Sequence, residues 1–245
     1  MAAANKPAIE VRGLTKSFGN NLALGGIDLE VETGKTLAVF GPNGAGKTTL
    51  IKILASIMKP TAGEVSINGF SLKDNAEAIR SHIGIVSHQT FLYGNLSAYE
   101  NLHFYSRMYD VPHYKKRIMQ VASMVGMESR LYDRINTLSR GMQQRFSIAR
   151  ALLHQPDIVL LDEPETGLDQ QAIAMLWELL KEDGSKKRSV VFTSHSLERG
   201  LKACDDLIIL NRGKIACCQP GSTLNLAGLE QLYKESTGSG SEAAR

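Results

Sequence analysis

The stretch TLAVFGPNGAGKTT, residues 36–49, decides the fold of this chain. Its second half matches the pattern G-x-x-x-x-G-K-[ST], directly after an apolar run of strand length and at the start of a helix, which is the context that this phosphate-loop pattern requires. Glycines let backbone N–H groups converge on phosphate oxygens, and a helix N-terminus adds partial positive charge. We therefore expect a nucleoside triphosphate to bind Gly41, Pro42, Asn43, Gly44, Ala45, Gly46, Lys47, Thr48 and Thr49.

Two side chains of this loop have specific expected roles. Lys47 should reach the β- and γ-phosphates, and the Thr48 hydroxyl should bind Mg²⁺. The alternative is a glycine-rich turn that Lys and Thr follow by chance, and it leaves the flanking strand and helix unexplained. GTPases, kinases, motors and helicases share such a loop, so other motifs must decide the class.

Strand and helix patterns surround the loop along all of the chain. Strand-like runs and turns fill the first seventy residues, helical periodicity follows up to about residue 153, and short apolar runs then alternate with helices. This alternation predicts an α/β fold with a mostly parallel sheet covered on both faces. We expect one domain over residues 7–220, a helical subdomain inserted at about 95–153, and a C-terminal extension over 221–245, disordered from about 236.

Composition excludes several classes of function. The 245 residues are 43% hydrophobic and 22% charged, as in a globular protein with a real core, and the net charge of +3 is too small to predict nucleic-acid binding. The three cysteines have no metal-site spacing and favour a reducing compartment. The N-terminus has no signal-peptide pattern, and every apolar run is far shorter than the roughly 20 residues that cross a bilayer. Any membrane role therefore requires a partner.

Two acidic residues follow the apolar run IVLL. Asp162 should lie at the carboxyl end of that strand, where ligands bind in open α/β sheets, and should bind Mg²⁺. Glu163 comes one residue later and, by strand alternation, should point the other way, towards an attacking water for which it would be the general base. The alternative for Glu163 is a helix cap or a solvent-facing side chain.

Two further strand-like runs also end in polar residues. VVFTSH ends at His195, and a lone histidine at the end of a strand usually has a structural role. Here a hydrogen bond from His195 to the γ-phosphate is favoured, because His195 should leave the sheet at the same edge as Asp162. IGIVSHQ ends at Gln89, whose amide suits Mg²⁺ and water. An exposed loop glutamine is an equally good reading of Gln89 taken alone.

The stretch LSRGMQQRFSIAR, residues 138–150, has the pattern of a capped helix. Ser139 is a typical N-cap residue, and Phe146, Ile148, Ala149 and Leu152 should face a core. This local role does not exclude a contact with nucleotide.

The chain resembles the ATP-binding subunit of ABC transporters over residues 7–220. The resemblance depends on motifs that occur in this order along one chain: the phosphate loop, Gln89, LSRGMQQR, IVLLDEP, GLD and His195. The resemblance implies a P-loop NTPase (RecA-like) core with an N-terminal antiparallel β subdomain and an inserted helical subdomain, and it implies ATP and Mg²⁺ as ligands. It implies that Phe18 stacks on adenine, that Ser139 and Gly141 belong to the family signature, usually LSGGQ, and that Asp169 belongs to the D-loop. The implied catalytic residues are Glu163, His195, Gln89 and Lys47, and the implied metal ligands are Thr48, Gln89 and Asp162.

The signature departs from the family pattern at two positions. Arg140 replaces the first glycine and Met142 replaces the glutamine. We still expect Ser139 and the backbone at Gly141 to contact phosphate. A side-chain hydrogen bond from Met142 is no longer expected, and Arg140 should face solvent.

The resemblance also implies partners and a location. Two such subunits, here two copies of this chain, pack head to tail about a twofold axis with two ATP molecules between them, and hydrolysis reopens the pair. A separate integral membrane permease subunit is expected, at the cytoplasmic face of the cell membrane, with no nucleic acid.

The transported substrate depends on a second, weaker resemblance. The run SHQTFLYGNLSAYENLHFY, residues 87–105, is similar to the haem-exporter ATPases of cytochrome c maturation, but similar runs occur in ATPases of drug and polysaccharide exporters. A soluble ABC ATPase of iron–sulfur assembly is the alternative outside transport.

Overall fold

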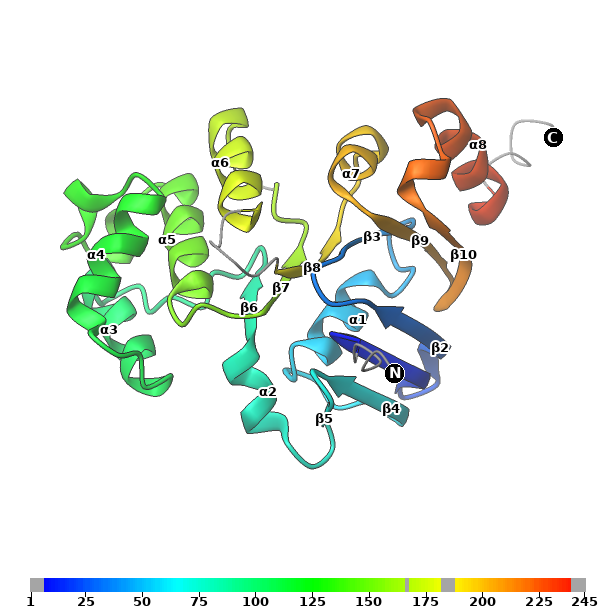
Figure 1. The fold of residues 1–245 in the computed structure, drawn as a ribbon, viewed down its shortest axis with the longest axis horizontal. Coiled ribbons are helices and arrows are strands. Elements are labelled where there is room, and N and C mark those ends of the chain that lie inside the picture. Colours follow the sequence, from blue (N-terminus) through cyan, green and yellow to red (C-terminus); the bar gives the residue numbers. More distant parts are fainter. Residues whose placement is uncertain (1–6, 166–167, 182–187, 239–245) are drawn as a thin grey trace, which may run out of the picture.

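A computed structural model describes residues 7–165, 168–181 and 188–238 of the chain. It has an N-terminal sheet, a larger central sheet with helices on it, and a group of helices beyond the central sheet, at the left of Figure 1. Among the described residues, no helix is long and apolar enough to cross a membrane.

The central sheet has six strands in the order β10-β9-β3-β8-β7-β6. Its parallel pairs are β3 with β8, β3 with β9, β6 with β7, and β7 with β8, while β9 and β10 pair antiparallel. β7 and β8 are buried at every residue, as expected for parallel strands that are covered on both faces. The strands are β3 (Thr36–Phe40), β6 (Ile83–Val86), β7 (Ile158–Asp162), β8 (Ser189–Thr193), β9 (Asp206–Asn211) and β10 (Lys214–Pro220).

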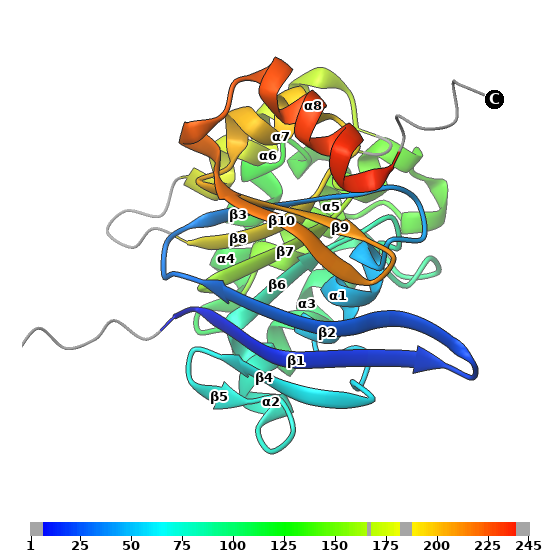
Figure 2. The same ribbon diagram turned by 90° about the vertical axis from the view of Figure 1, so that its right-hand side faces the viewer.

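The N-terminal sheet is antiparallel, in the order β2-β1-β4-β5. Figure 2 shows it below the central sheet, with α1 (Lys47–Leu54) between the two. Buried side chains of α1 and of both sheets form one hydrophobic core. The strands are β1 (Ile9–Phe18), β2 (Asn21–Val31), β4 (Ala62–Ile67) and β5 (Phe70–Ser71).

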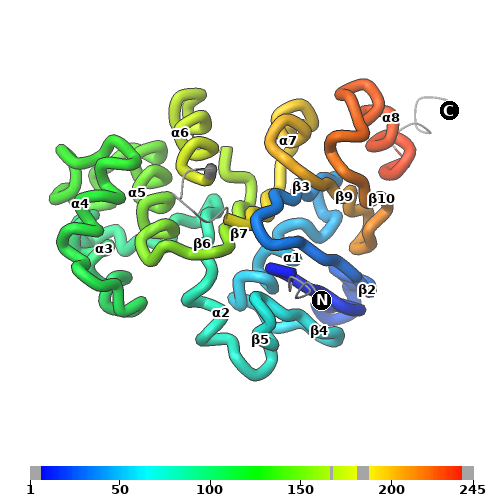
Figure 3. Tube along the Cα trace, in the orientation of Figure 1, coloured from blue at the N-terminus to red at the C-terminus, as the bar shows by residue number. Residues whose placement is uncertain are grey.

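The helical group is inserted between two neighbouring strands of the central sheet. The tube in Figure 3 leaves β6, passes through α3, α4 and α5, and returns to β7. A second hydrophobic core joins this group to the central sheet and includes Phe146, Ile148, Ala149 and Leu152 of α5, all expected to face a core. The helices are α3 (Ala98–Met108), α4 (Tyr114–Met124) and α5 (Arg140–Leu152).

Helices cover the opposite face of the central sheet from α1. They are α6 (Gln170–Lys181), α7 (Leu197–Ala203) and α8 (Leu226–Thr237), at the top of Figure 2. The short helix α2 (Ala76–His82) is not one of them and lies beside β5. Two sheets, a phosphate-loop core and an inserted helical group confirm the predicted fold class.

The C-terminal extension begins with a helix. α8 continues through Thr237, next to the point at about residue 236 from which disorder is expected, and Asn211 Nδ2 donates a hydrogen bond to Ser236 O at 2.9 Å. Leu229 anchors this helix because it is completely buried. Residues 239–245 of the expected tail lie outside the described residues, as do Thr166 and Gly167 of the stretch that follows β7.

His154 lies directly after α5, against the outer edge of β6. Its Nε2 donates a hydrogen bond to Ile83 O at 3.1 Å, and its ring stacks on Tyr109 with the centroids 4.0 Å apart. Burial lowers the pKa of His154 from 6.5 to about 4, and the charges of Arg150 and Arg117 act in the same direction. The histidine is therefore neutral in the folded protein at pH 7.

We predict that His154→Gln reduces the loss of stability in acid. The folded-state pKa lies below the ordinary value, so as the pH falls from 6.5 to about 4 the unfolded chain binds the proton first, and the unfolding free energy drops by up to about 3 kcal/mol. Glutamine can still donate to Ile83 O but does not titrate. Urea unfolding at pH 7 and pH 4.5 measures the difference, with the exposed His88→Gln as the control, and equal pH dependence of His154→Gln and the wild type would contradict the prediction.

Candidate functional site

The phosphate loop connects the carboxyl end of β3 to α1. Gly46, directly before α1, has a φ of 106°, and a Cβ at this position would lie 2.6 Å from Ala23 O and 2.7 Å from Leu24 Cδ2. Only glycine fits this conformation and this approach of β2. The loop therefore presents the N-terminus of α1 at the carboxyl edge of the central sheet.

Lys47 lies buried across this loop. Its Nζ donates to Gly41 O at 2.8 Å and to Pro42 O at 3.1 Å. Burial lowers the pKa of Lys47, and the carboxylates of Glu163 and Asp162 oppose that change. A triphosphate in the loop would offer the ammonium group stronger acceptors than these neutral carbonyls.

Two hydroxyls hold the carboxylate of Asp162. Thr48 Oγ1 donates to Asp162 Oδ1 at 3.2 Å, and Thr193 Oγ1 donates to the same oxygen at 3.0 Å. Asp162 ends β7 and pairs with Thr193 at the end of β8, so the parallel register brings the two together. The other oxygen, Oδ2, has no hydrogen bond among the described residues and is the atom that a cation would reach.

Glu163 leaves the strand, contrary to the expected alternation. β7 ends at Asp162, and Glu163 has a φ of 51°, a left-handed conformation that non-glycine residues seldom adopt. Its backbone N–H donates to Thr193 Oγ1 at 2.8 Å, which fixes this turn. The turn brings Glu163 Oε1 within 2.6 Å of His195 Nε2, so two of the four residues expected to be catalytic form a pair.

Thr193 is the residue that the sequence-based reasoning missed. Its hydroxyl donates to Asp162 and accepts from the Glu163 N–H, so it sets the positions of both acids. The available signal was a polar residue at the end of the apolar run VVFT. We call Lys47, Thr48, Asp162, Glu163, Thr193 and His195 the carboxyl-edge cluster.

The donor set of this edge fits Mg²⁺ that arrives with a nucleotide. A hydroxyl and a carboxylate are hard oxygen ligands, and Mg²⁺ typically takes one or two protein ligands together with phosphate oxygens and water. Within the described part of the chain, no group of three His, Cys, Asp or Glu side chains forms a metal site of its own. Thr48 and Asp162 are thus the residues that would hold the ion.

Gln89 and Phe18 lie outside the carboxyl-edge cluster. Gln89 is exposed after the end of β6, and no hydrogen bond within the described residues joins it to Thr48 or Asp162. Phe18 is half exposed at the end of β1, with Lys16 Nζ 5.1 Å from its ring centroid. An exposed ring at this hairpin remains available for stacking on a base.

The signature residues lie at the N-terminus of α5. Ser139 caps the helix, because its Oγ accepts a hydrogen bond from the Met142 N–H at 3.3 Å. Gly141 is half-buried, Arg140 is exposed, and the Met142 side chain packs against the core. The two departures from the family pattern therefore leave the helix N-terminus itself open.

Asp169 lies at the start of α6. Its Oδ1 accepts from the Ala172 N–H at 2.7 Å, and its Oδ2 lies 3.6 Å from a guanidinium nitrogen of Arg145 on α5. Asp169 thus connects α6 to the signature helix and does not touch the carboxyl-edge cluster.

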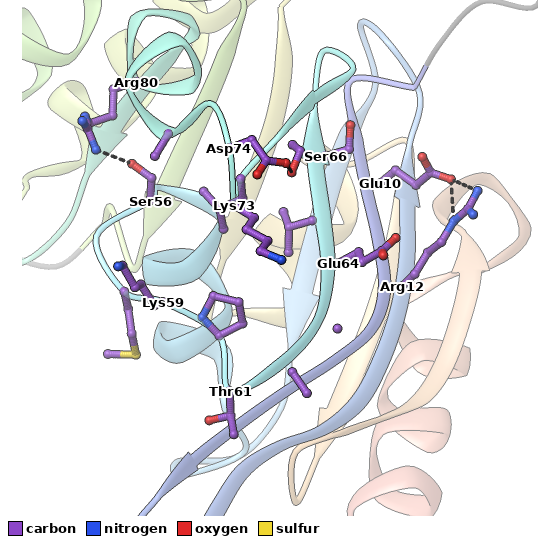
Figure 4. Close-up of a pocket in the computed structure, with 18 residues that line it drawn as sticks. Glu10, Arg12, Ser56, Lys59, Thr61, Glu64, Ser66, Lys73, Asp74 and Arg80 are labelled. Carbon is purple, nitrogen blue, oxygen red and sulfur yellow. Dashed lines mark hydrogen bonds and ion pairs between the residues drawn. The ribbon is translucent and has the colours of Figure 1, made fainter.

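A groove of about 940 Å³ lies away from all these residues. Figure 4 shows it between β4, β1 and the loop before β4, and its lining includes Lys59, Lys73, Arg80, Glu64 and Asp74. Charges of both signs line it, and no member of the carboxyl-edge cluster does. The chemistry that the sequence predicts is therefore at the sheet edge and not in this groove.

A family model described as ABC transporter matches residues 24–166. The chain is 32% identical over 209 residues to the linearmycin resistance ATP-binding protein LnrL of Bacillus subtilis, covering 84% of this chain and 67% of the relative. It is 32% identical over 208 residues to the Nod factor export ATP-binding protein I of Cupriavidus metallidurans, covering 84% and 69%.

A solved structure is similar over most of its length. It is the dimeric structure of a post-hydrolysis state of the ATP-binding cassette MJ0796 bound to ADP and Pi, with a TM-score of 0.79 and 29% identity. The match covers 86% of this chain and 98% of that one. The similarity therefore includes almost all of a cassette that holds the products of ATP hydrolysis.

We predict that Thr193→Val slows ATP turnover about 10- to 100-fold. Valine has nearly the same shape but gives up the bonds to Asp162 and to the Glu163 N–H, and a bond to a charged group contributes about 1.5–3 kcal/mol. Thr193→Ser keeps the hydroxyl and should retain most of the rate. Steady-state phosphate release measures both variants, and wild-type turnover of Thr193→Val would contradict the assigned role.

Proposed function

The chain belongs to the ABC transporter family, and from this membership we propose that it is the ATP-hydrolysing motor subunit of an exporter. The observation that carries the proposal is the carboxyl-edge cluster, in which a carboxylate that fits a cation and a glutamate paired with His195 lie beside the phosphate loop. Phosphoryl transfer depends mostly on positioning and charge stabilisation, which this arrangement supplies.

Glu163 is the proposed general base. A water oxygen attacks the γ-phosphorus, its proton goes to a Glu163 carboxylate oxygen, and the bond to the β,γ-bridging oxygen breaks to leave ADP and phosphate. Such a base contributes about 10²–10⁴ in rate. When His195 Nε2 turns from Glu163 to the γ-phosphate, Oε1 becomes free to accept that proton. Mg²⁺, when bound, neutralises charge on the phosphates.

The signature residues are proposed to act on the nucleotide of a second subunit. Ser139 caps α5 and Gly141 lies in its first turn, in the helical group, whereas Lys47 and Thr48 begin α1 between the two sheets (Figures 1 and 2). No hydrogen bond within the described residues joins the signature to the phosphate loop. Two copies packed head to tail would bring each signature to the other copy's phosphate loop, with two ATP molecules between them. Loss of the γ-phosphate then removes contacts to both copies and reopens the pair.

A separate integral membrane permease is the proposed partner, on the cytoplasmic face of the membrane. The helical group offers an exposed apolar surface, formed by Tyr93, Phe104 and Met108, each 45–52% exposed. Tyr93 and Phe104 pack edge to face with centroids 5.5 Å apart. Large aromatic side chains that are neither buried nor scattered are typical of protein contacts.

Export of a drug-type or polysaccharide-type substrate is the favoured substrate class. The relatives above carry names for linearmycin resistance and Nod factor export. These names favour this substrate class over haem. The run at residues 87–105, which is similar to the haem-exporter ATPases of cytochrome c maturation, is the observation on the other side.

We predict that Glu163→Gln binds ATP but does not turn it over. The amide keeps the size of the side chain and cannot accept the proton, so a closed dimer should accumulate with ATP. Phosphate release and sedimentation velocity measure the two effects. Glu165→Gln, two residues later, is the matched control and should retain turnover. Wild-type turnover by Glu163→Gln would remove Glu163 as the base.

We predict that the chain co-purifies from membranes with an integral membrane subunit, which mass spectrometry would identify. Phe104→Ala should lower the recovery of that subunit several-fold and leave the turnover of the isolated chain unchanged, because the side chain lies on the proposed docking surface. Met119→Ala on α4 has the same exposed fraction of 45% and is the matched control. Recovery with soluble partners alone would instead favour a soluble ABC ATPase, such as one of iron–sulfur assembly.

A further inference from the structure

The strand β6 is the last strand of the central sheet, yet its outer edge is not open. Edge strands leave backbone groups unpaired on one side, and alternate carbonyls of a strand point to that side. Here side chains from α5 and from the residues just after it donate hydrogen bonds to the backbone carbonyls of Ile83, Ile85 and Ser87. Three bonds form this edge ladder: His154 to Ile83 O at 3.1 Å, Arg150 to Ile85 O at 2.6 Å, and Gln144 to Ser87 O at 3.2 Å.

Gly84 allows α5 to lie directly on this edge. A Cβ at Gly84 would be 2.5 Å from Ala151 O and 2.9 Å from Pro156 Cγ. Any side chain there would push the helix off the strand. The contact between α5 and β6 is therefore as close as two backbones allow.

Arg150 contacts the chain on both sides of Gln89. Before Gln89, its guanidinium binds Ile85 O, and after Gln89 it lies 5.4 Å from the ring centroid of Phe91. Phe91 has a left-handed φ of 55°, and its carbonyl accepts a hydrogen bond from the Tyr105 hydroxyl at 2.6 Å. The Tyr105 ring in turn lies 5.2 Å from the guanidinium. One arginine thus holds both ends of the loop that carries Gln89.

Gln144 holds the loop at a third point. It binds the carbonyl of Ser87, and the Ser87 hydroxyl donates to Gln89 O at 2.8 Å. The backbone of Gln89 is therefore fixed relative to α5, although its side chain is exposed.

A purely structural role does not explain the surroundings of Arg150. Only 4% of the residue is exposed, its Nε has no hydrogen-bond partner, and no carboxylate pairs with it among the described residues. Burying a cationic group with one unsatisfied N–H costs stability. Arg188 is equally buried, at 5% exposed, but donates Nε to Pro156 O and a terminal nitrogen to Leu179 O.

We propose that Arg150 is a positioning residue for ATP hydrolysis: it fixes the Gln89 loop to α5, so that Gln89 and the Ser139 end of the same helix move as one unit. The inference rests on the proposed function, because Gln89 is expected to act on Mg²⁺ and Ser139 on the nucleotide of a second subunit. α5 is continuous from Arg140 to Leu152, so a displacement of the loop reaches the signature through a single helix.

The test compares Arg150→Lys with Arg188→Lys, since both keep a buried positive charge and lose the guanidinium fork. Arg150→Lys should lower kcat about tenfold and raise the Mg²⁺ concentration for half-maximal rate about fivefold, with ATP affinity in EDTA within about twofold of wild type. Arg188→Lys should keep both kinetic values within about twofold. Equal kinetics of the two variants would overturn the proposal.

A double-mutant cycle separates positioning from general damage. In a Gln89→Ala background, Arg150→Lys should change kcat by less than about twofold, because the group that it positions is already gone. The same fold-loss in both backgrounds would overturn the proposal. If Arg150→Lys does not fold, Tyr105→Phe takes its place in the cycle, since it removes only the bond to Phe91 O. A wild type without Mg²⁺-dependent hydrolysis would overturn the proposed function as well, whereas an active wild type with additive variants would overturn this inference alone.

Discussion

The parallel pairing of β3, β8 and β7 is the constraint on which the rest of the structure depends. Parallel strands end at the same edge of a sheet, so the phosphate loop after β3, the acids after β7 and His195 after β8 must meet there. The register then sets the finer geometry, because it places Thr193 opposite Asp162. A single threonine hydroxyl orients the carboxylate beside the phosphate loop and the turn that points Glu163 at His195.

On the proposed function, one copy of the chain supplies only part of each nucleotide site. Its phosphate loop lies between two sheets, its signature begins a helix of the inserted group, and the edge ladder ties that helix to the Gln89 loop. An off-pattern signature is compatible with this arrangement. Ser139 still caps the helix by accepting from the Met142 N–H, the Met142 side chain packs inward, and Arg140 faces solvent. The N–H groups that precede Met142 in the first turn therefore stay available to an anion.

Local patterns were enough to predict the phosphate loop, the strand ends and the Ser139 cap, because each depends on residues adjacent in sequence. Contacts between distant segments were not predictable in this way. Thr193 and Arg150 matter through partners 31 and 65 residues away, which only strand register and helix packing bring near. Alternation failed at Glu163 because the strand ends one residue earlier.

The proposed function requires that the phosphate loop of one copy and the signature of another hold each nucleotide together. Mixing two variants tests it most directly, both in the Glu163→Gln background: Lys47→Ala, which damages the loop, and Gly141→Asp, which damages the signature. A head-to-tail pair of one of each has one complete site. With ATP, sedimentation velocity should show dimers in the mixture and far fewer in either variant alone. Monomers at every mixing ratio would contradict it.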